Sequence, residues 1–228
     1  MTLNLPRPIL YLITRGATTE ATTPDSKEFR EIVLQVSAAV TAGIQLIQIR
    51  EKQLPPRVLF ELAREVVATA RGSSTKVLIN DRAGIAASAG ADGVHLTTTS
   101  LTPDVIRKTF GAKFLIGAST HSLVDARDSF RQGADFAVFG PIFPSLSKAS
   151  YGPPLGLEQL KEAARELTPF PLIALGGISV GRVNECLLAG AAGVAGITLF
   201  SKPEDLATTV ERIGTLRKLL AGELHYEE

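Results

Sequence analysis

Two basic side chains stand at the end of an apolar run in the first quarter of the chain. The run covers residues 44–49, and Arg50 and Lys52 follow it. Alternate side chains of a strand share a face, so Gln48 and Arg50 are predicted to point the same way, toward the protein interior. A guanidinium buried without a partner costs several kcal/mol and must be neutralised. Two partners are open for Arg50: an internal carboxylate, or a ligand that carries phosphate or carboxylate.

An amide and a carboxylate follow the next apolar run. Residues 76–79 lead directly into Asn80 and Asp81. Mg²⁺ in proteins prefers one or two carboxylates together with phosphate oxygens and water, which makes Asp81 the candidate metal ligand. The alternative is structural, because a helical pattern begins at Ala83 and Asp is a favoured N-cap residue.

A histidine stands just beyond a further apolar run, at residues 114–118. His121 follows it with Ser119 between them, which places an imidazole where it could transfer a proton. The alternative is a turn residue, because Ser122 is predicted to begin a helix. His95 comes directly after Gly93 and Val94 and is predicted to be a packed strand residue.

Two glycine-containing segments near the end of the chain are candidates for binding phosphate. Gly176 and Gly177 follow the apolar run at 171–175, and glycines before a helix leave backbone N–H groups able to hold an anion. The alternative for this pair is a tight turn. Gly196 and Thr198 follow the last apolar run and give a second such segment.

The connection at residues 140–156 is long and carries hydroxyl and ammonium groups. It contains Ser145, Ser147 and Lys148, and the pair Pro153-Pro154 comes after them. Long loops in compact domains are often functional, so this segment is predicted to be a lid over a phosphorylated substrate. The alternative is an ordinary solvated loop.

A barrel of alternating strands and helices would bring these segments to one rim. Four helical patterns end in a glycine that leads into an apolar run, as expected where a left-handed residue closes a helix before a strand; these glycines are Gly43, Gly90, Gly133 and Gly190. With three intervening runs (76–79, 114–118 and 171–175) and a first run at 9–14, they give eight strand candidates, nearly all apolar, as in parallel sheets covered on both faces. We therefore predict one α/β domain over residues 1–228, a single (β/α)8 TIM barrel. Its rival, an open doubly wound sheet, would need edge protection that the sequence does not show.

Composition narrows the class of partner. The 228 residues carry a formal charge of +1, without the basic stripe and interleaved aromatic residues of a nucleic-acid face. We expect a small-molecule partner and no nucleic acid. Cys186 is the only cysteine, so an intrachain disulfide is impossible, and an inert buried thiol in a reducing compartment is predicted. No signal segment or membrane-length apolar run is found, and a cytoplasmic protein is expected.

Six short blocks, in this order, resemble the thiamine phosphate synthase and thiazole tautomerase (TenI-like) superfamily. They are residues 48–52 (QIREK), 80–82 (NDR), 93–96 (GVHL), 117–121 (GASTH), 140–143 (GPIF) and 176–178 (GGI). In the synthase, the resemblance implies that 4-amino-2-methyl-5-hydroxymethylpyrimidine diphosphate ionises and its methylene carbon is captured by the nitrogen of a thiazole phosphate. Diphosphate is released, and its charge must be neutralised.

The resemblance also implies roles for individual residues. It places catalysis on Arg50, Lys52, Ser119, His121 and Lys148. It places the pyrimidine diphosphate against Gln48, Arg50, Lys52, Asn80, Ser119 and Lys148. It places the thiazole phosphate against Ser145, Ser147, Gly177, Ile197 and Thr198. Asp81 matches one magnesium ligand, so Mg²⁺ is the expected cofactor, and a homodimer is the expected assembly because many barrels dimerise.

One departure from the synthase pattern weakens the metal site. Where that pattern has a run that ends in a magnesium-binding aspartate, this chain reads Thr97-Thr98-Thr99-Ser100. A hydroxyl at Ser100 removes one negative charge, so Mg²⁺ is expected to bind more weakly. The metal-independent tautomerase, which acts on a carboxythiazole phosphate and has a histidine where His121 stands, is the alternative. A protein that only binds a thiamine precursor is the third possibility.

Overall fold

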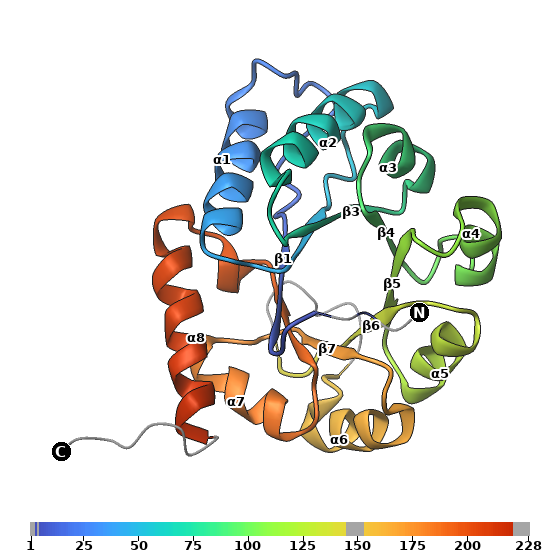
Figure 1. Cartoon of the computed structure of the whole chain (residues 1–228), viewed down its shortest axis with the longest axis vertical. Helices are drawn as coiled ribbons and strands as arrows, with labels where there is room; N and C mark the ends of the chain where they lie inside the picture. The colour runs from blue at the N-terminus through green and yellow to red at the C-terminus, as the bar shows by residue number, and fades with distance from the viewer. Residues whose placement is uncertain (1–2, 4, 145–152, 221–228) are drawn as a thin grey trace.

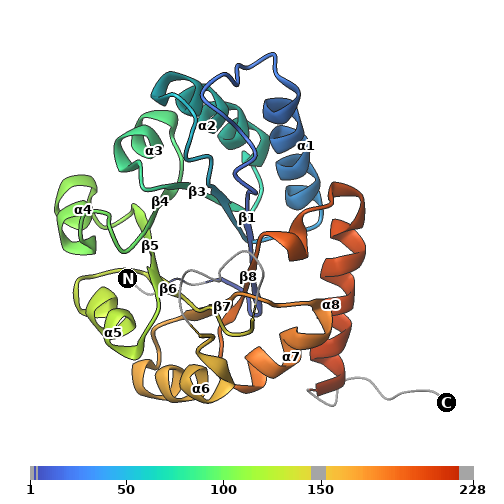
Figure 2. The ribbon, with the colours of Figure 1, turned by 180° about the vertical axis from the view of Figure 1, so that it is seen from behind.

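The computed structural model describes residue 3 and residues 5–144 and 153–220. Eight parallel strands close a barrel in chain order, each hydrogen-bonded to the next, and β8 pairs back with β1 (Figures 1 and 2). The strands are β1 (Ile9–Ile13), β2 (Leu46–Ile49), β3 (Lys76–Asn80), β4 (Gly93–Leu96), β5 (Leu115–Thr120), β6 (Phe136–Phe139), β7 (Leu172–Leu175) and β8 (Gly193–Gly196). The predicted (β/α)8 barrel is confirmed, and the open sheet is excluded.

Within the described ranges, eight α-helices surround the barrel, one after each strand (Figure 1). They are α1 (Lys27–Thr41), α2 (Pro56–Ala70), α3 (Ala83–Ala89), α4 (Pro103–Phe110), α5 (Leu123–Arg131), α6 (Gly156–Leu167), α7 (Val180–Leu188) and α8 (Leu206–Leu220). The helix α2 shows why they pack this way, because its buried residues Leu59, Leu62, Ala63 and Val66 recur at helical spacing. In the described ranges, no helix has both the length and the apolar character needed to span a membrane.

The four glycine junctions form as predicted, each with a positive φ: Gly43 at 78°, Gly90 at 75°, Gly133 at 89° and Gly190 at 94°. In each case the residue after the glycine still donates to a helix carbonyl, as Ile44 N does to Ala39 O at 3.0 Å. This is the Schellman arrangement, which satisfies the last carbonyls of the helix. The strand therefore begins three residues after the glycine in each case, later than the apolar run suggests.

Aromatic and aliphatic side chains fill the barrel interior. Tyr11, Leu46, Leu78 and Phe136 belong to one buried cluster inside it. The polar side chains start nearer the carboxyl ends of the strands, where Gln48 and His95 are 2% exposed. The barrel interior is thus apolar in its main part and polar toward the carboxyl ends of the strands. This places the ligand site at the carboxyl-terminal rim, as in other barrels of this type.

Two strands run further toward this rim than the sequence pattern predicts. Ser119 and Thr120 belong to β5, because they pair with Val138 and Phe139 of β6. Asn80 is likewise the last residue of β3 and pairs with His95. Our placement of Ser119 and Asn80 after their strands is therefore wrong. The ladder to the neighbouring strand holds these backbones rigidly, which suits residues that must position a substrate.

Cys186 lies in α7 and is fully buried. Burial raises the pKa of its thiol from 9.0 to about 12, so the reactive thiolate is scarce at neutral pH. We expect the folded protein to resist a thiol reagent such as Ellman's reagent at pH 8, and the protein in denaturant to react with one equivalent. Equal rates in the two states would show that the thiol is accessible.

Candidate active site

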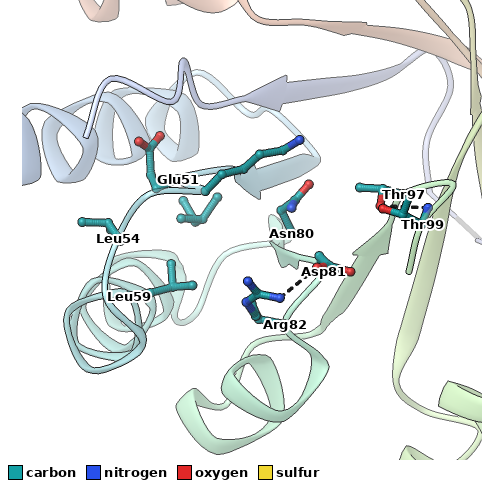
Figure 3. Close-up of a pocket in the computed structure, with 10 residues that line it drawn as sticks. Glu51, Leu54, Leu59, Asn80, Asp81, Arg82, Thr97 and Thr99 are labelled. Carbon is teal, nitrogen blue, oxygen red and sulfur yellow. Dashed lines mark hydrogen bonds and ion pairs between the residues drawn. The ribbon is translucent and has the colours of Figure 1, made fainter. Parts of the chain in front are cut away.

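Polar residues from the ends of β2, β3 and β4 line one cavity of about 140 Å³. Its wall includes Lys52, Asn80, Asp81, Thr97 and Thr99, and Leu54 and Leu59 lie across from them (Figure 3). Asn80 ends β3 and Asp81 follows it, and Thr97 and Thr99 follow β4; Figure 3 shows the threonines to one side of Asn80 and Asp81. The structure thus brings together the predicted Lys52, Asn80 and Asp81, whereas Gln48 and Arg50 are not among the residues that line this cavity.

Arg50 lies just beyond β2, partly buried against the loop after β1. Its backbone N–H donates to Thr14 Oγ1 at 2.8 Å, and its guanidinium lies near Gly16. In the described ranges no carboxylate oxygen lies within 4.0 Å of this guanidinium. The internal ion pair that the sequence left open for Arg50 is not found there, so its charge remains available to an anionic ligand.

Glu51 is a residue whose role the sequence analysis missed. Its carboxylate is 3% exposed and accepts three hydrogen bonds: from Gly16 N at 3.0 Å, from Thr18 N at 3.2 Å and from Thr18 Oγ1 at 2.7 Å. These bonds tie the loop after β1 to the end of β2 and hold the backbone that carries Arg50. The one signal in the sequence was that Glu51 stands between two cations, Arg50 and Lys52. A carboxylate at that position serves a purpose other than binding the ligand.

Gln48 lies inside the barrel, two residues before Arg50. Its side-chain nitrogen is buried and has no hydrogen-bond acceptor within the part of the chain that the structure describes. A buried amide donor left unsatisfied costs about 1–3 kcal/mol, so such a group is retained where a ligand completes it.

Asp81 has a left-handed backbone, with φ at 59°, and its N–H donates to His95 O at 2.9 Å. The N-cap position of α3 belongs to Arg82, so the carboxylate of Asp81 does not cap this helix. It accepts instead from Arg82 at 2.9 Å and from the hydroxyl of Ser100. Backbone strain of this kind is concentrated at functional sites.

Ser100 reaches Asp81 because the turn after β4 folds back on itself. Ser100 Oγ accepts from Thr97 N at 2.8 Å, and Ser100 N donates to Thr97 O at 3.2 Å. The residue that replaces the expected aspartate therefore touches the one predicted metal ligand. In the described ranges no three His, Cys, Asp or Glu side chains gather in a way that could hold a metal without substrate.

His121 lies at the end of β5, half-buried, with its ring turned toward the next strand. Its Nδ1 donates to Gly140 O at 2.6 Å, because a carbonyl can only accept. Its backbone N–H donates to Asp125, and Ser122 caps α5 by accepting from Asp125 N at 3.1 Å. The predicted turn at His121 is thus correct for its backbone. The contact with Gly140 O shows that Nδ1 of His121 carries a proton.

The turn at Gly176 and Gly177 requires glycine at both positions. Both have positive φ, at 100° and 64°. A Cβ on Gly177 would lie 2.5 Å from Pro144 O, and one on Gly176 would lie 2.6 Å from the Cα of Pro141. The start of the long loop after β6 therefore rests directly on the predicted phosphate-binding turn.

The segment after β8 lies beside this turn, because Leu175 of β7 pairs with Ala195 of β8. Thr198 begins a short 3-10 helix, Thr198–Phe200, and Ile197 precedes it as the N-cap. Two loops that begin with glycine or a helix N-terminus therefore meet where barrels commonly bind phosphate. Ser145, Ser147 and Lys148 lie outside the described residues, and their roles stay predictions.

Comparison with known proteins identifies the family of this chain. Residues 10–200 match the thiamine monophosphate synthase family. A putative thiamine-phosphate synthase of Geobacter sulfurreducens is 45% identical over 166 residues, covering 73% of this chain and 78% of that protein. A putative thiamine-phosphate synthase 2 of Aquifex aeolicus is 37% identical over 199 residues, covering 87% and 99%.

A solved structure extends the likeness to three dimensions. The thiamine phosphate pyrophosphorylase of Pyrococcus furiosus superposes with a TM-score of 0.72 at 27% identity, covering 90% of this chain and 96% of that one. The sequence resemblance is thereby confirmed over most of the barrel, and the chain belongs to the thiamine monophosphate synthase family.

Proposed function

We propose that this protein is a thiamine-phosphate synthase, which joins an aminopyrimidine diphosphate to a thiazole phosphate and releases diphosphate. The observation that carries the proposal is the pair Gln48 and Arg50, the first inside the barrel on β2 and the second directly after that strand. The first is a buried donor and the second a cation, and neither has an acceptor or carboxylate partner in the described part of the chain. A substrate with a polar ring joined to a diphosphate matches that order of groups.

The reaction needs the departing diphosphate to be stabilised more strongly than the bound one. Arg50 and Lys52 follow the same strand, and the hydrogen bond from Arg50 N to Thr14 Oγ1 holds the backbone of Arg50 before the substrate arrives. Gln48 and Ser119 hold the pyrimidine ring inside the mouth of the barrel. The turns after β7 and β8 hold the thiazole phosphate on the other side of the rim. The two substrates then meet over the barrel axis, with the thiazole nitrogen facing the methylene carbon. Lys148 and the serines of the long loop would close this arrangement.

The residues present fit a magnesium ion that is shared with the diphosphate. Asp81 supplies one carboxylate, and the remaining ligands of Mg²⁺ are commonly phosphate oxygens and water. Bound there, the ion would help neutralise the charge of the leaving group. Ser100 contributes no charge, so the protein without diphosphate is expected to hold Mg²⁺ weakly.

Restoring the missing carboxylate tests that metal site. We expect Ser100→Asp to tighten Mg²⁺ binding about tenfold in the absence of diphosphate, because it places a second hard, charged ligand against Asp81. Calorimetric titration with MgCl₂, with and without inorganic diphosphate, measures this. Thr102→Asp is the matched control, since it adds the same charge at an exposed N-cap two residues away. An equal gain in both variants would show a general charge effect instead of a ligand.

Three assays on the purified protein separate the proposed function from its alternatives. Formation of thiamine phosphate with release of diphosphate in MgCl₂ supports the synthase. Metal-independent isomerisation of the carboxythiazole phosphate, lost in His121→Ala, would instead support the tautomerase, in which the imidazole of His121 would transfer the proton. Binding of either substrate without turnover would support a non-catalytic binder, and both outcomes would overturn the proposal.

A further inference from the structure

Three polar side chains form a hydrogen-bonded chain across the interior of the barrel. Tyr11 of β1 reaches His95 of β4, with 3.1 Å between Oη and Nδ1. His95 reaches Ser119 of β5, with 3.0 Å between Nε2 and Oγ. Tyr11 and His95 are 0% and 2% exposed, whereas Ser119 is partly exposed at the rim. The chain thus runs from the dry core to the proposed pyrimidine site.

The direction of the first hydrogen bond follows from burial. Tyr11 Oη has no other acceptor in the described ranges, and a buried hydroxyl proton needs one. Burial raises the pKa of Tyr11 well above its usual value, so the phenol keeps its proton. Tyr11 therefore donates, and His95 Nδ1 accepts.

The direction of the second bond follows from the first. An imidazole that accepts at Nδ1 carries its proton at Nε2, so His95 donates to Ser119 Oγ. The Nδ1–H tautomer is disfavoured, because a proton on Nδ1 would leave the buried proton of Tyr11 without an acceptor. Ser119 has accepted one hydrogen bond, and its own proton finds no acceptor in the described part of the chain. That proton is left for a group in the open mouth of the barrel.

Packing holds the rings in this arrangement. Tyr11, His95 and Phe136 lie in mutual contact, with ring centroids 5.7 to 6.1 Å apart. Gly117, between them, must lack a side chain: a Cβ there would lie 2.4 Å from the ring of Phe136 and 2.8 Å from His95 Nδ1. The absence of a side chain at Gly117 therefore gives the rings of Phe136 and His95 the space that they occupy.

We propose that Tyr11 and His95 are positioning residues that fix the Ser119 hydroxyl as a hydrogen-bond donor toward the bound pyrimidine. The substrate atom at Ser119 is then an acceptor, such as a ring nitrogen, and not an amino group. This inference rests on the proposed function, because it assumes that the pyrimidine binds at Ser119.

Kinetics test the coupling between the three residues. We expect Tyr11→Phe to lower kcat about tenfold, the effect of one lost hydrogen bond, with the KM for thiazole phosphate unchanged. In a His95→Gln background the same substitution should cost less than about twofold, since an amide can donate to Ser119 without help from Tyr11. Ile173→Val, which trims the same interior cluster without touching the chain, is the packing control. A tenfold loss in both backgrounds, or an equal loss in Ile173→Val, would overturn the inference.

A spectroscopic measurement of the His95 tautomer tests the inference independently of enzyme activity. In protein labelled with ¹⁵N-histidine, the inference predicts the neutral Nε2–H tautomer for His95, assigned by loss of its signals in His95→Gln, and a shift toward mixed tautomers in Tyr11→Phe. An Nδ1–H tautomer in the wild type would contradict it. Wild-type protein that makes no thiamine phosphate would remove the proposed function, whereas the tautomer would still report the direction of the chain.

Discussion

Replacing Arg50 with alanine is expected to lower kcat for thiamine phosphate formation by about 10²–10³, the effect of removing one preorganised group that stabilises developing charge. Arg50 has no carboxylate partner in the described ranges, so its loss leaves no protein group uncompensated and the fold should persist. Steady-state kinetics with both substrates, together with a thermal melt, measure the two effects separately.

Arg57→Ala is the matched control for that experiment. Arg57 lies in the first turn of α2, its side chain is 90% exposed, and it pairs with Glu61, four residues on. Exposed pairs of this kind contribute about 0.3–0.5 kcal/mol, so activity and stability should stay near the wild type. Wild-type turnover in Arg50→Ala would show that the departing diphosphate is not bound by Arg50 at this rim.

Replacing Gly177 with alanine is the second substitution with a large expected effect. The new Cβ would lie 2.5 Å from Pro144 O in a backbone with φ of 64°, so the turn and the loop resting on it must both shift. We expect a loss of about 1–3 kcal/mol in unfolding free energy from this strain, and a KM for thiazole phosphate raised about tenfold or more. The KM for the pyrimidine diphosphate should change little, because that site lies on other strands.

Gly181→Ala separates the turn from the helix that follows it. Gly181 lies in α7, and a Cβ there meets nothing within 4 Å. Alanine is the better helix former by about 1 kcal/mol, so this variant should be slightly more stable and equally active. If Gly177→Ala left the KM for thiazole phosphate unchanged, the glycine turn would be a structural turn only.

The barrel was predictable from local chemistry because its signals repeat. The four closing glycines and the apolar runs each reflect a single rule, that a left-handed residue ends a helix and a doubly covered strand is apolar. The strand ends were less predictable. The polar side chains of Ser119 and Asn80 are typical of loops. Backbone pairing with the neighbouring strand nevertheless keeps both residues within their β-strands.

The charged residues of the site were predictable from the sequence, whereas the residues that hold them and their neighbours in place were not. Arg50 and Asp81 are ionic groups at strand ends, which the sequence displays directly. Glu51 and Tyr11 act through residues far away in the chain, Glu51 by binding Gly16 and Thr18 and Tyr11 by binding His95, 84 positions on. Such partnerships depend on which strands meet across a closed barrel, and a local pattern carries no record of them.

The most direct measurement of the central claim is a crystal structure with MgCl₂, inorganic diphosphate and the thiazole phosphate bound together. The account predicts diphosphate within hydrogen-bond distance of Arg50 and Lys52, and the thiazole phosphate on the backbone N–H groups of Gly177 and Thr198. Diphosphate bound away from this rim, or Arg50 turned onto a protein carboxylate in the complex, would contradict it.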